Sequence, residues 1–275
     1  MDDGPIDVRI DAGVVPERLD GAIDADSWMQ ISPEAFQLNA PTARYRVIGG
    51  RRIVVQVEPG ASERDVRLYL LGTVLGALCH QRRLTPLHAT ALEVDGRAIA
   101  VAGPSGVGKS TLAAQFQARG GAVLADDLCV VKVAADGGPM VRPGLARVKL
   151  WGDSLALAGL AGSGWPRIGD DIEKFSVPVD AAAVGRARPL RRLYVLRGGT
   201  GQTAEIRRLT GPEAVHAAIN NVYRWPVAAA MGRSAALFAE LATLAAKVEI
   251  FEVGFTHDGS APMRILDMLE QHWRP

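Results

Sequence analysis

The sequence predicts an α/β protein in which a glycine-rich loop joins a strand of a sheet to a flanking helix, with a small N-terminal α+β region. The glycine-rich segment GPSGVGKST (Gly103–Thr111) follows the apolar run Arg97–Ala102 and precedes a helical pattern over Lys109–Arg119. Short apolar runs alternate with helical patterns along the rest of the chain. The length of 275 residues suits one large domain or two small ones.

Composition and charge argue against several protein classes. The formal net charge is +1, so the chain lacks the general positive field of a nucleic-acid-binding protein. Its start, MDDGPIDVRIDAG, is acidic and lacks the apolar core of a signal peptide. The long apolar run Leu68–Leu78 is shorter than the ~18 residues of a membrane span. We therefore expect a cytoplasmic protein without nucleic-acid or membrane partners.

The two cysteines, Cys79 and Cys129, lie in no CxxC pair or Cys/His cluster. This isolation argues against a disulfide framework or a structural zinc site. We expect two reduced thiols in the protein core.

An N-terminal region is assigned to residues 1–83 and a second domain to 84–275. Before Ser27 the chain carries eight acidic residues and two arginines. This acidic leader is interpreted either as a solvated, loosely ordered segment or as a docking site for a substrate or partner. A hairpin around Gly49-Gly50 and a helix over Ser62–Arg82, with Ser62 as its N-cap, are expected to follow.

Turn chemistry predicts a hairpin at the start of the second domain. Asp95-Gly96 stands between the apolar runs Thr90–Val94 and Arg97–Ala102, and this dipeptide favours a two-residue type I′ turn. In that register Thr90 faces Val101. Continuing outward places His88 opposite Gly103, the first residue of the glycine-rich loop. His88 is then either a structural residue or one that acts beside the loop.

The glycine-rich loop fits the Walker A pattern, Gly103-x4-Gly108-Lys109-Ser110. Glycines allow a backbone that points successive N–H groups at phosphate oxygens, and the following helix presents its positive end. Lys109 is expected on the β- and γ-phosphates and Ser110 on Mg²⁺, which makes ATP and Mg²⁺ the expected cofactors. The predicted nucleotide contacts are Gly103, Ser105, Gly106, Val107, Gly108, Lys109, Ser110 and Thr111.

An acidic pair, Asp126-Asp127, ends the predicted strand Ala122–Ala125. A right-handed crossover makes this strand parallel to the one before the loop, so both end at one sheet edge. One carboxylate can hold Mg²⁺ and the other can accept a proton from an attacking hydroxyl. Which one is the base is left open. The predicted metal ligands are Ser110 and Asp127, and the predicted catalytic residues are His88, Lys109, Asp126 and Asp127.

Further cations are weaker candidates for contacts with substrate or phosphate. If RVKLW (Arg147–Trp151) is a strand, Arg147, Lys149 and Trp151 share one face. Lys149 and Lys174 are two of only five lysines in the chain. Arg192 belongs to an arginine run that is either an exposed strand entry or a dock for acidic groups. The run consists of Arg186, Arg188, Arg191, Arg192 and Arg197.

Together, His88-Ala89, the Asp95-Gly96 hairpin, GPSGVGKST and LADD (Leu124–Asp127) resemble the catalytic domain of the HPr kinase/phosphorylase family. The resemblance is best over about residues 84–133. It implies a fold related to phosphoenolpyruvate carboxykinase and Mg²⁺-dependent phosphorylation of a protein serine. The segment Ser163–Phe175 stands in place of the family's second signature loop. The N-terminal region does not look like the family's usual larger regulatory domain. This shorter build resembles the HPr-kinase-like proteins found with ribosomally made peptides, some of which phosphorylate a serine of a lasso-peptide precursor, and the family resemblance is compatible with a homo-oligomer.

The sequence therefore predicts an ATP-dependent kinase that acts on a serine or threonine of a peptide or small protein. A small-molecule kinase differs only in its acceptor pocket, which the sequence leaves undefined. A nucleotide-sensing regulatory module is the alternative from another class. It would bind ATP without transferring the phosphoryl group.

Overall fold

The computed structural model describes residues 7–24, 28–133, 138–179, 186–199, 204–256, 258 and 261–273. The chain forms two compact units. Unit 1 comprises Met1–Leu84, Ile168–Ile172 and Arg224–Leu237, and unit 2 comprises Thr85–Arg167, Glu173–Tyr223 and Phe238–Pro275. The first boundary lies next to the predicted one at 83/84, and two later segments join unit 1.

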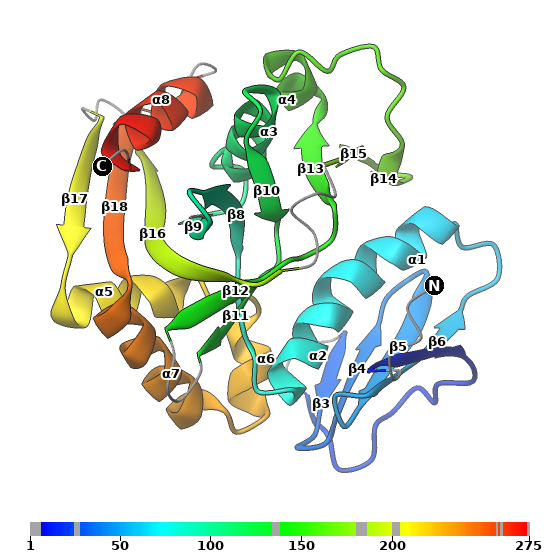
Figure 1. The fold of residues 1–275 in the computed structure, drawn as a ribbon. Coiled ribbons are helices and arrows are strands. Elements are labelled where there is room, and N and C mark those ends of the chain that lie inside the picture. Colours follow the sequence, from blue (N-terminus) through cyan, green and yellow to red (C-terminus); the bar gives the residue numbers. More distant parts are fainter. Residues whose placement is uncertain are drawn as a thin grey trace. The chain divides into compact units, whose positions relative to one another are not determined.

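Unit 1 is a sheet with the strand order β1-β6-β5-β4-β3-β2 and a helical segment packed against it (Figure 1). β5 and β6 form the predicted hairpin, with Ile48 paired to Arg52. The elements of this unit are β1 (Arg9–Ala12), β2 (Ile23–Asp24), β3 (Met29–Ile31), β4 (Ala35–Asn39), β5 (Ala43–Ile48), β6 (Arg52–Val57), α1 (Glu63–Tyr69), the π-helical turn η1 (Leu70–Val74), α2 (Leu75–Gln81) and α6 (Trp225–Ala230).

The predicted helix over Ser62–Arg82 is present, interrupted by the π-helical turn. Ser62 caps it as expected, because its hydroxyl accepts a hydrogen bond from the backbone N–H of Asp65 at 3.2 Å. The helix packs on the sheet through Val74 and Leu78, which join a buried cluster with Tyr45. Burial of these apolar side chains holds the helix on the sheet.

The interpretation of the N-terminal segment as a loosely ordered leader is wrong for the residues that the structure describes. β1 pairs in parallel with β6, with Arg9 opposite Arg52, and β2 pairs with β3, with Ile23 opposite Ile31. The leader acids at positions 2, 3 and 26 lie outside the described residues.

Unit 2 is built on a large sheet that has nine strands among the described residues. The long strand β16 pairs with β12 near its start and then lies between β9 and β18, parallel to both. The elements are β7 (Thr85–Leu87), β8 (Ala89–Val94), β9 (Arg97–Ala102), α3 (Lys109–Ala118), β10 (Ala122–Ala125), β11 (Cys129–Val133), β12 (Pro139–Arg142), β13 (Arg147–Trp151), α4 (Gly152–Leu157), β15 (Ile172–Pro178), β16 (Arg188–Gly199), β17 (Glu205–Leu209), α5 (Gly211–Asn220), β18 (Glu249–Thr256) and α8 (Ala261–Trp273). β14 (Arg167–Gly169), the first residue of β15 and α7 (Ser234–Lys247) mark places where an element runs across a unit boundary in the sequence.

The β8–β9 hairpin confirms the predicted register. Thr90 pairs with Val101, and Ala89 pairs with Ala102, so the next position outward sets His88 opposite Gly103. Asp95 and Gly96 have φ values of 50° and 72°, as a type I′ turn requires. β10 is antiparallel to β8 and therefore parallel to β9, as predicted, but β8 lies between them.

Helices cover both faces of the sheet in unit 2. α3 and α8 pack on the face that carries Tyr194, Leu196 and Val253, and these residues form one buried cluster with the two helices. α5 lies over the opposite face. Because side chains alternate along a strand, this second face carries Val195 and Glu252.

Two smaller predictions concern cysteines and membranes. Cys79 and Cys129 are free and buried, as expected. Within the described ranges, every helix is too short or too polar to span a lipid bilayer.

Candidate active site

The glycine-rich loop joins β9 to α3 at the carboxyl end of β9, and its backbone requires glycine at several positions. Gly103, Gly106 and Gly108 have φ values of 141°, 82° and 101°, which side chains disfavour. A Cβ on Gly103 would lie 2.8 Å from the carbonyl oxygen of Leu196, and one on Gly108 would lie 3.2 Å from Pro262. Only glycine at positions 103 and 108 lets the loop backbone lie this close to Leu196 and Pro262.

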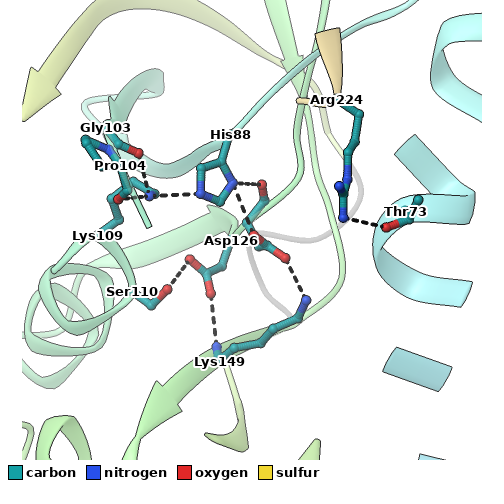
Figure 2. Close-up of polar contacts among 10 residues, drawn as sticks. Thr73, His88, Gly103, Pro104, Lys109, Ser110, Asp126, Lys149 and Arg224 are labelled. Carbon is teal, nitrogen blue, oxygen red and sulfur yellow. Dashed lines mark hydrogen bonds and ion pairs between the residues drawn. The ribbon is translucent and has the colours of Figure 1, made fainter. Parts of the chain in front are cut away.

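Lys109 begins α3, and its ammonium group turns back toward the start of the loop (Figure 2). Its Nζ donates to the carbonyl oxygens of Gly103 and Pro104 at 2.8 and 2.9 Å, and it lies 3.1 Å from Nε2 of His88. Burial is the main cause that lowers the pKa of Lys109 to about 8. The arrangement holds a cation beside the loop's N–H groups.

His88 connects the lysine to the acidic pair. Its Nδ1 lies 3.2 Å from Oδ1 of Asp127 and 3.3 Å from the backbone oxygen of that residue. Its backbone N–H donates to the carbonyl of Asn221 at 2.7 Å, and its ring lies beside that of Tyr223 at 5.9 Å. His88 is therefore fixed by its backbone, its ring and both ring nitrogens.

Asp126 contacts the residue that follows the lysine. Its Oδ1 accepts a hydrogen bond from the hydroxyl of Ser110 at 2.9 Å, and its Oδ2 accepts one from the backbone N–H of Lys149 at 3.0 Å. Burial raises the pKa of this carboxyl, against the effect of these two donors.

Asp127 points to different partners because its backbone is left-handed, with a φ of 69°. Its Oδ2 accepts a hydrogen bond from Nζ of Lys149 at 2.7 Å, while Oδ1 faces His88. Although burial opposes it, the hydrogen bond from His88 and the charge of Lys149 hold the pKa of Asp127 well below its usual range. Asp127 is therefore a stable anion between two nitrogen groups.

The antiparallel strand pair β13–β15 supplies the opposite wall. Val148 and Leu150 are buried, so Arg147, Lys149 and Trp151 share the other face, as predicted. Trp151 on β13 pairs with Lys174 on β15, whose Nζ lies 4.9 Å from the centre of the indole ring. This contact is a cation–π interaction at the rim of the site.

These elements enclose a cavity of about 530 Å³, here named the loop cavity. Its lining comes from the glycine-rich loop, β13, α4, Lys174 and the start of α8. The lining residues are His88, Ser105, Gly106, Gly108, Lys109, Ser110, Thr111, Asp127, Lys149, Trp151, Asp153, Ser154, Leu157, Lys174, Asp258 and Pro262. Three of the five lysines of the chain thus line one cavity.

Some predicted site residues lie elsewhere. Arg192 is not among the residues that line the loop cavity; its guanidinium donates to Glu249 at 2.9 Å and to the backbone oxygen of His272 at 2.9 Å. Arg188 and Arg197 of the same run form ion pairs with Glu93 on β8 and Glu252 on β18. The side chain of Val107 is in the core.

The predicted metal ligands, Ser110 and Asp127, have different hydrogen-bond partners in the structure. Ser110 contacts Asp126, whereas both carboxylate oxygens of Asp127 face nitrogen groups. The described part of the chain has no cluster of three or more His, Cys, Asp or Glu side chains able to hold a metal. A hydroxyl and one carboxylate are nevertheless suitable ligands for a Mg²⁺ ion that also binds substrate phosphates.

Sequence reasoning missed the contributions of α4 and of the start of α8. The hydroxyl of Thr111 donates to that of Ser154 at 2.9 Å, which ties α3 to α4. Asp258 and Pro262 follow β18, which runs parallel to β16 and β9 and therefore ends at the same sheet edge as the loop. Only the strand order, which the sequence does not show, could have indicated them.

No known family model matches this chain, and no curated protein matches it. Among solved structures, the chain is similar to the HPr(Ser) kinase/phosphatase from Coxiella burnetii, with 14% sequence identity and a TM-score of 0.37. That match covers 68% of this chain and 95% of the other. With its several sheets and helices, the chain is a mixed α/β protein, which is the predicted class.

Proposed function

We propose that this protein is an ATP- and Mg²⁺-dependent kinase that transfers the γ-phosphoryl group to a serine or threonine hydroxyl of a peptide or small protein. The observation that carries the proposal is the convergence of Lys109, His88 and the Asp126-Asp127 pair at one end of a glycine-rich loop. The resemblance noted in the sequence further suggests a ribosomally made precursor peptide as the acceptor.

The loop residues supply the phosphate contacts in this proposal. Backbone N–H groups of the loop and the positive end of α3 bind phosphate oxygens, and Lys109 adds a charge that the buried setting strengthens. Ser110 and Asp126 are the residues that would hold Mg²⁺, which would neutralise charge on the β- and γ-phosphates.

Transfer itself forms one bond and breaks one. The acceptor oxygen bonds to the γ-phosphorus, the bond from that phosphorus to the bridging oxygen breaks, and its electron pair leaves with ADP. The hydroxyl proton passes to the Asp126-Asp127 carboxylate pair. Lys149 and His88 fix the orientation of Asp127 in this pair.

Transfer of label from γ-³²P-ATP to a pool of serine- and threonine-containing peptides tests the proposal. Wild type should label a peptide, and Asp126→Asn should keep its Mg²⁺-independent nucleotide binding but lose about 10²–10⁴-fold in transfer. Asp267→Asn is the matched control and should behave as wild type. Asp267 lies on α8, where its carboxylate forms an ion pair with Arg119.

The other outcomes separate the alternatives. Nucleotide binding without label on any peptide, but with label on an added small alcohol, would replace the peptide kinase by a small-molecule kinase. Binding without transfer to either acceptor would indicate a nucleotide-sensing module.

A further inference from the structure

A second cavity of about 460 Å³ lies between α5 and the sheet, here named the α5 cavity. Its strand residues include Val195, Arg207, Leu209 and Glu252, which belong to the sheet face opposite α3 and α8. The remaining lining residues are His88, Gly103, Pro104, Leu196, Arg197, Glu213, His216, Ala217, Asn220 and Asn221.

The α5 cavity reaches the candidate active site. His88 lines both this cavity and the loop cavity, and the first two residues of the glycine-rich loop form part of the α5 cavity. The position of α5 relative to His88 is fixed, because the carbonyl of Asn221 accepts the backbone N–H of His88 at 2.7 Å. A ligand in the α5 cavity therefore has a defined position next to the site of transfer.

The charges in the α5 cavity cancel one another. Arg197 lies 2.7 Å from Glu252, and Arg207 lies 3.0 Å from Glu213 and 3.4 Å from Glu252. Two cations thus face two anions in direct contact. A phosphorylated acceptor would need a cationic surplus, so this lining favours an uncharged ligand.

Two polar side chains on α5 offer complementary hydrogen-bonding groups. Asn220 lies one helical turn after His216, and its Nδ2 donates to Nδ1 of His216 at 3.2 Å. Nε2 of His216 therefore carries the ring proton as a donor, and Oδ1 of Asn220 remains an acceptor. One donor and one acceptor on the same helix face match the C=O and N–H of a peptide unit, while Val195, Leu209 and Ala217 give apolar contacts.

We propose that the α5 cavity is the acceptor site and takes an uncharged peptide segment whose serine or threonine hydroxyl points to His88. The proposal rests on the proposed kinase function, to which it adds the place and chemistry of the acceptor. His216 and Asn220 bind the peptide backbone, and the hydroxyl reaches the γ-phosphate at the junction of the two cavities.

The probe for the test is N-acetyl-serine N-methylamide, observed by saturation-transfer NMR in the presence of Mg²⁺ and a non-hydrolysable ATP analogue. Wild type should bind it, and Ala217→Trp, which fills the cavity, should abolish binding. Ala239→Trp on the exposed part of α7 is the size-matched control and should bind as wild type does. Nucleotide affinity should agree within twofold in all three proteins.

A second variant removes the possibility that Ala217→Trp merely misfolds. His216 and Asn220 are exposed, so the double change to alanine should leave the fold intact and weaken probe binding at least tenfold. Failure of wild type to bind the probe, or unchanged binding by the double variant, would overturn the proposal.

Transfer measurements separate this proposal from the kinase proposal. Transfer to serine peptides with an unchanged acceptor KM in the double variant would leave the kinase standing and reject the α5 cavity as the acceptor site. Probe binding that depends on α5, without transfer to any peptide, would reject the kinase and keep the peptide site.

Discussion

Nζ of Lys109 and Nε2 of His88 lie 3.1 Å apart. An ammonium group can only donate, so Nε2 is the acceptor and the ring proton of His88 is on Nδ1, facing Asp127. The loop lysine and the acidic pair are therefore linked through one histidine in a single tautomer. A nucleotide that attracts Lys109 toward its phosphates must compete with this hydrogen bond.

Replacing Lys109 by alanine should abolish nearly all phosphoryl transfer and weaken ATP binding by at least about tenfold. The physical reason is the loss of a buried cation next to the phosphate-binding backbone. Isothermal titration and γ-³²P transfer measure the two effects. Lys132→Ala, at an exposed position on β11, is the control. Wild-type turnover in Lys109→Ala would remove the loop from the mechanism.

Nucleotide binding should weaken as the pH rises from 7 to 9. Burial lowers the pKa of Lys109 from 10.5 to about 8, so the ammonium is present below pH 8 and is lost above it. The affinity at pH 9 should be about three- to tenfold below that at pH 7. A fluorescent ATP analogue reports this dependence. Lys109→Arg keeps its charge and should flatten the profile, and a flat wild-type profile would contradict the expectation.

Lys174 should contribute to phosphate binding. Its Nζ rests on the ring of Trp151, and no ion pair engages it among the residues described. Lys174→Gln should weaken ATP binding about three- to tenfold and leave AMP binding nearly unchanged. Lys132→Gln makes the same chemical change away from the cavity. Equal ATP affinities in the two variants would show that Lys174 has no such role.

Gly103→Ala should destabilise unit 2 by about 1–3 kcal/mol, because the new Cβ would meet the carbonyl of Leu196 at 2.8 Å and the residue has a φ of 141°. Denaturant unfolding followed by tryptophan fluorescence measures the change. Gly138→Ala is the matched control, since no atom lies within 4 Å of its Cβ. Equal stability of the two variants would show that the loop tolerates a side chain.

The parts of the site that the sequence predicted depend on local chemistry. The Asp95-Gly96 turn sets the register of the β8–β9 hairpin, and that register places His88 beside the loop. The glycines of the loop and the N-cap of the first helix are likewise local signals. In each case the residues that decide the structure lie within a few positions of one another.

The errors and omissions involve contacts between distant parts of the chain. β1 became a strand by pairing with β6, forty-three positions later at Arg9 and Arg52, and its own sequence alternates only weakly. Whether Ser110 contacts Asp126 or Asp127 depended on the left-handed backbone at Asp127, a conformation that aspartate adopts only occasionally. The contribution of α8 required the parallel order of β9, β16 and β18.

The two-residue turn at Asp95-Gly96 fixes how far along the β8–β9 hairpin His88 lies from the glycine-rich loop. Each strand advances about 3.3 Å per residue and alternates its faces, so one inserted residue in β8 would shift His88 along Gly103 and turn its side chain away from Lys109. Variants with an insertion or a deletion in β8 should therefore be inactive. Substitutions that keep its length should be tolerated wherever packing allows.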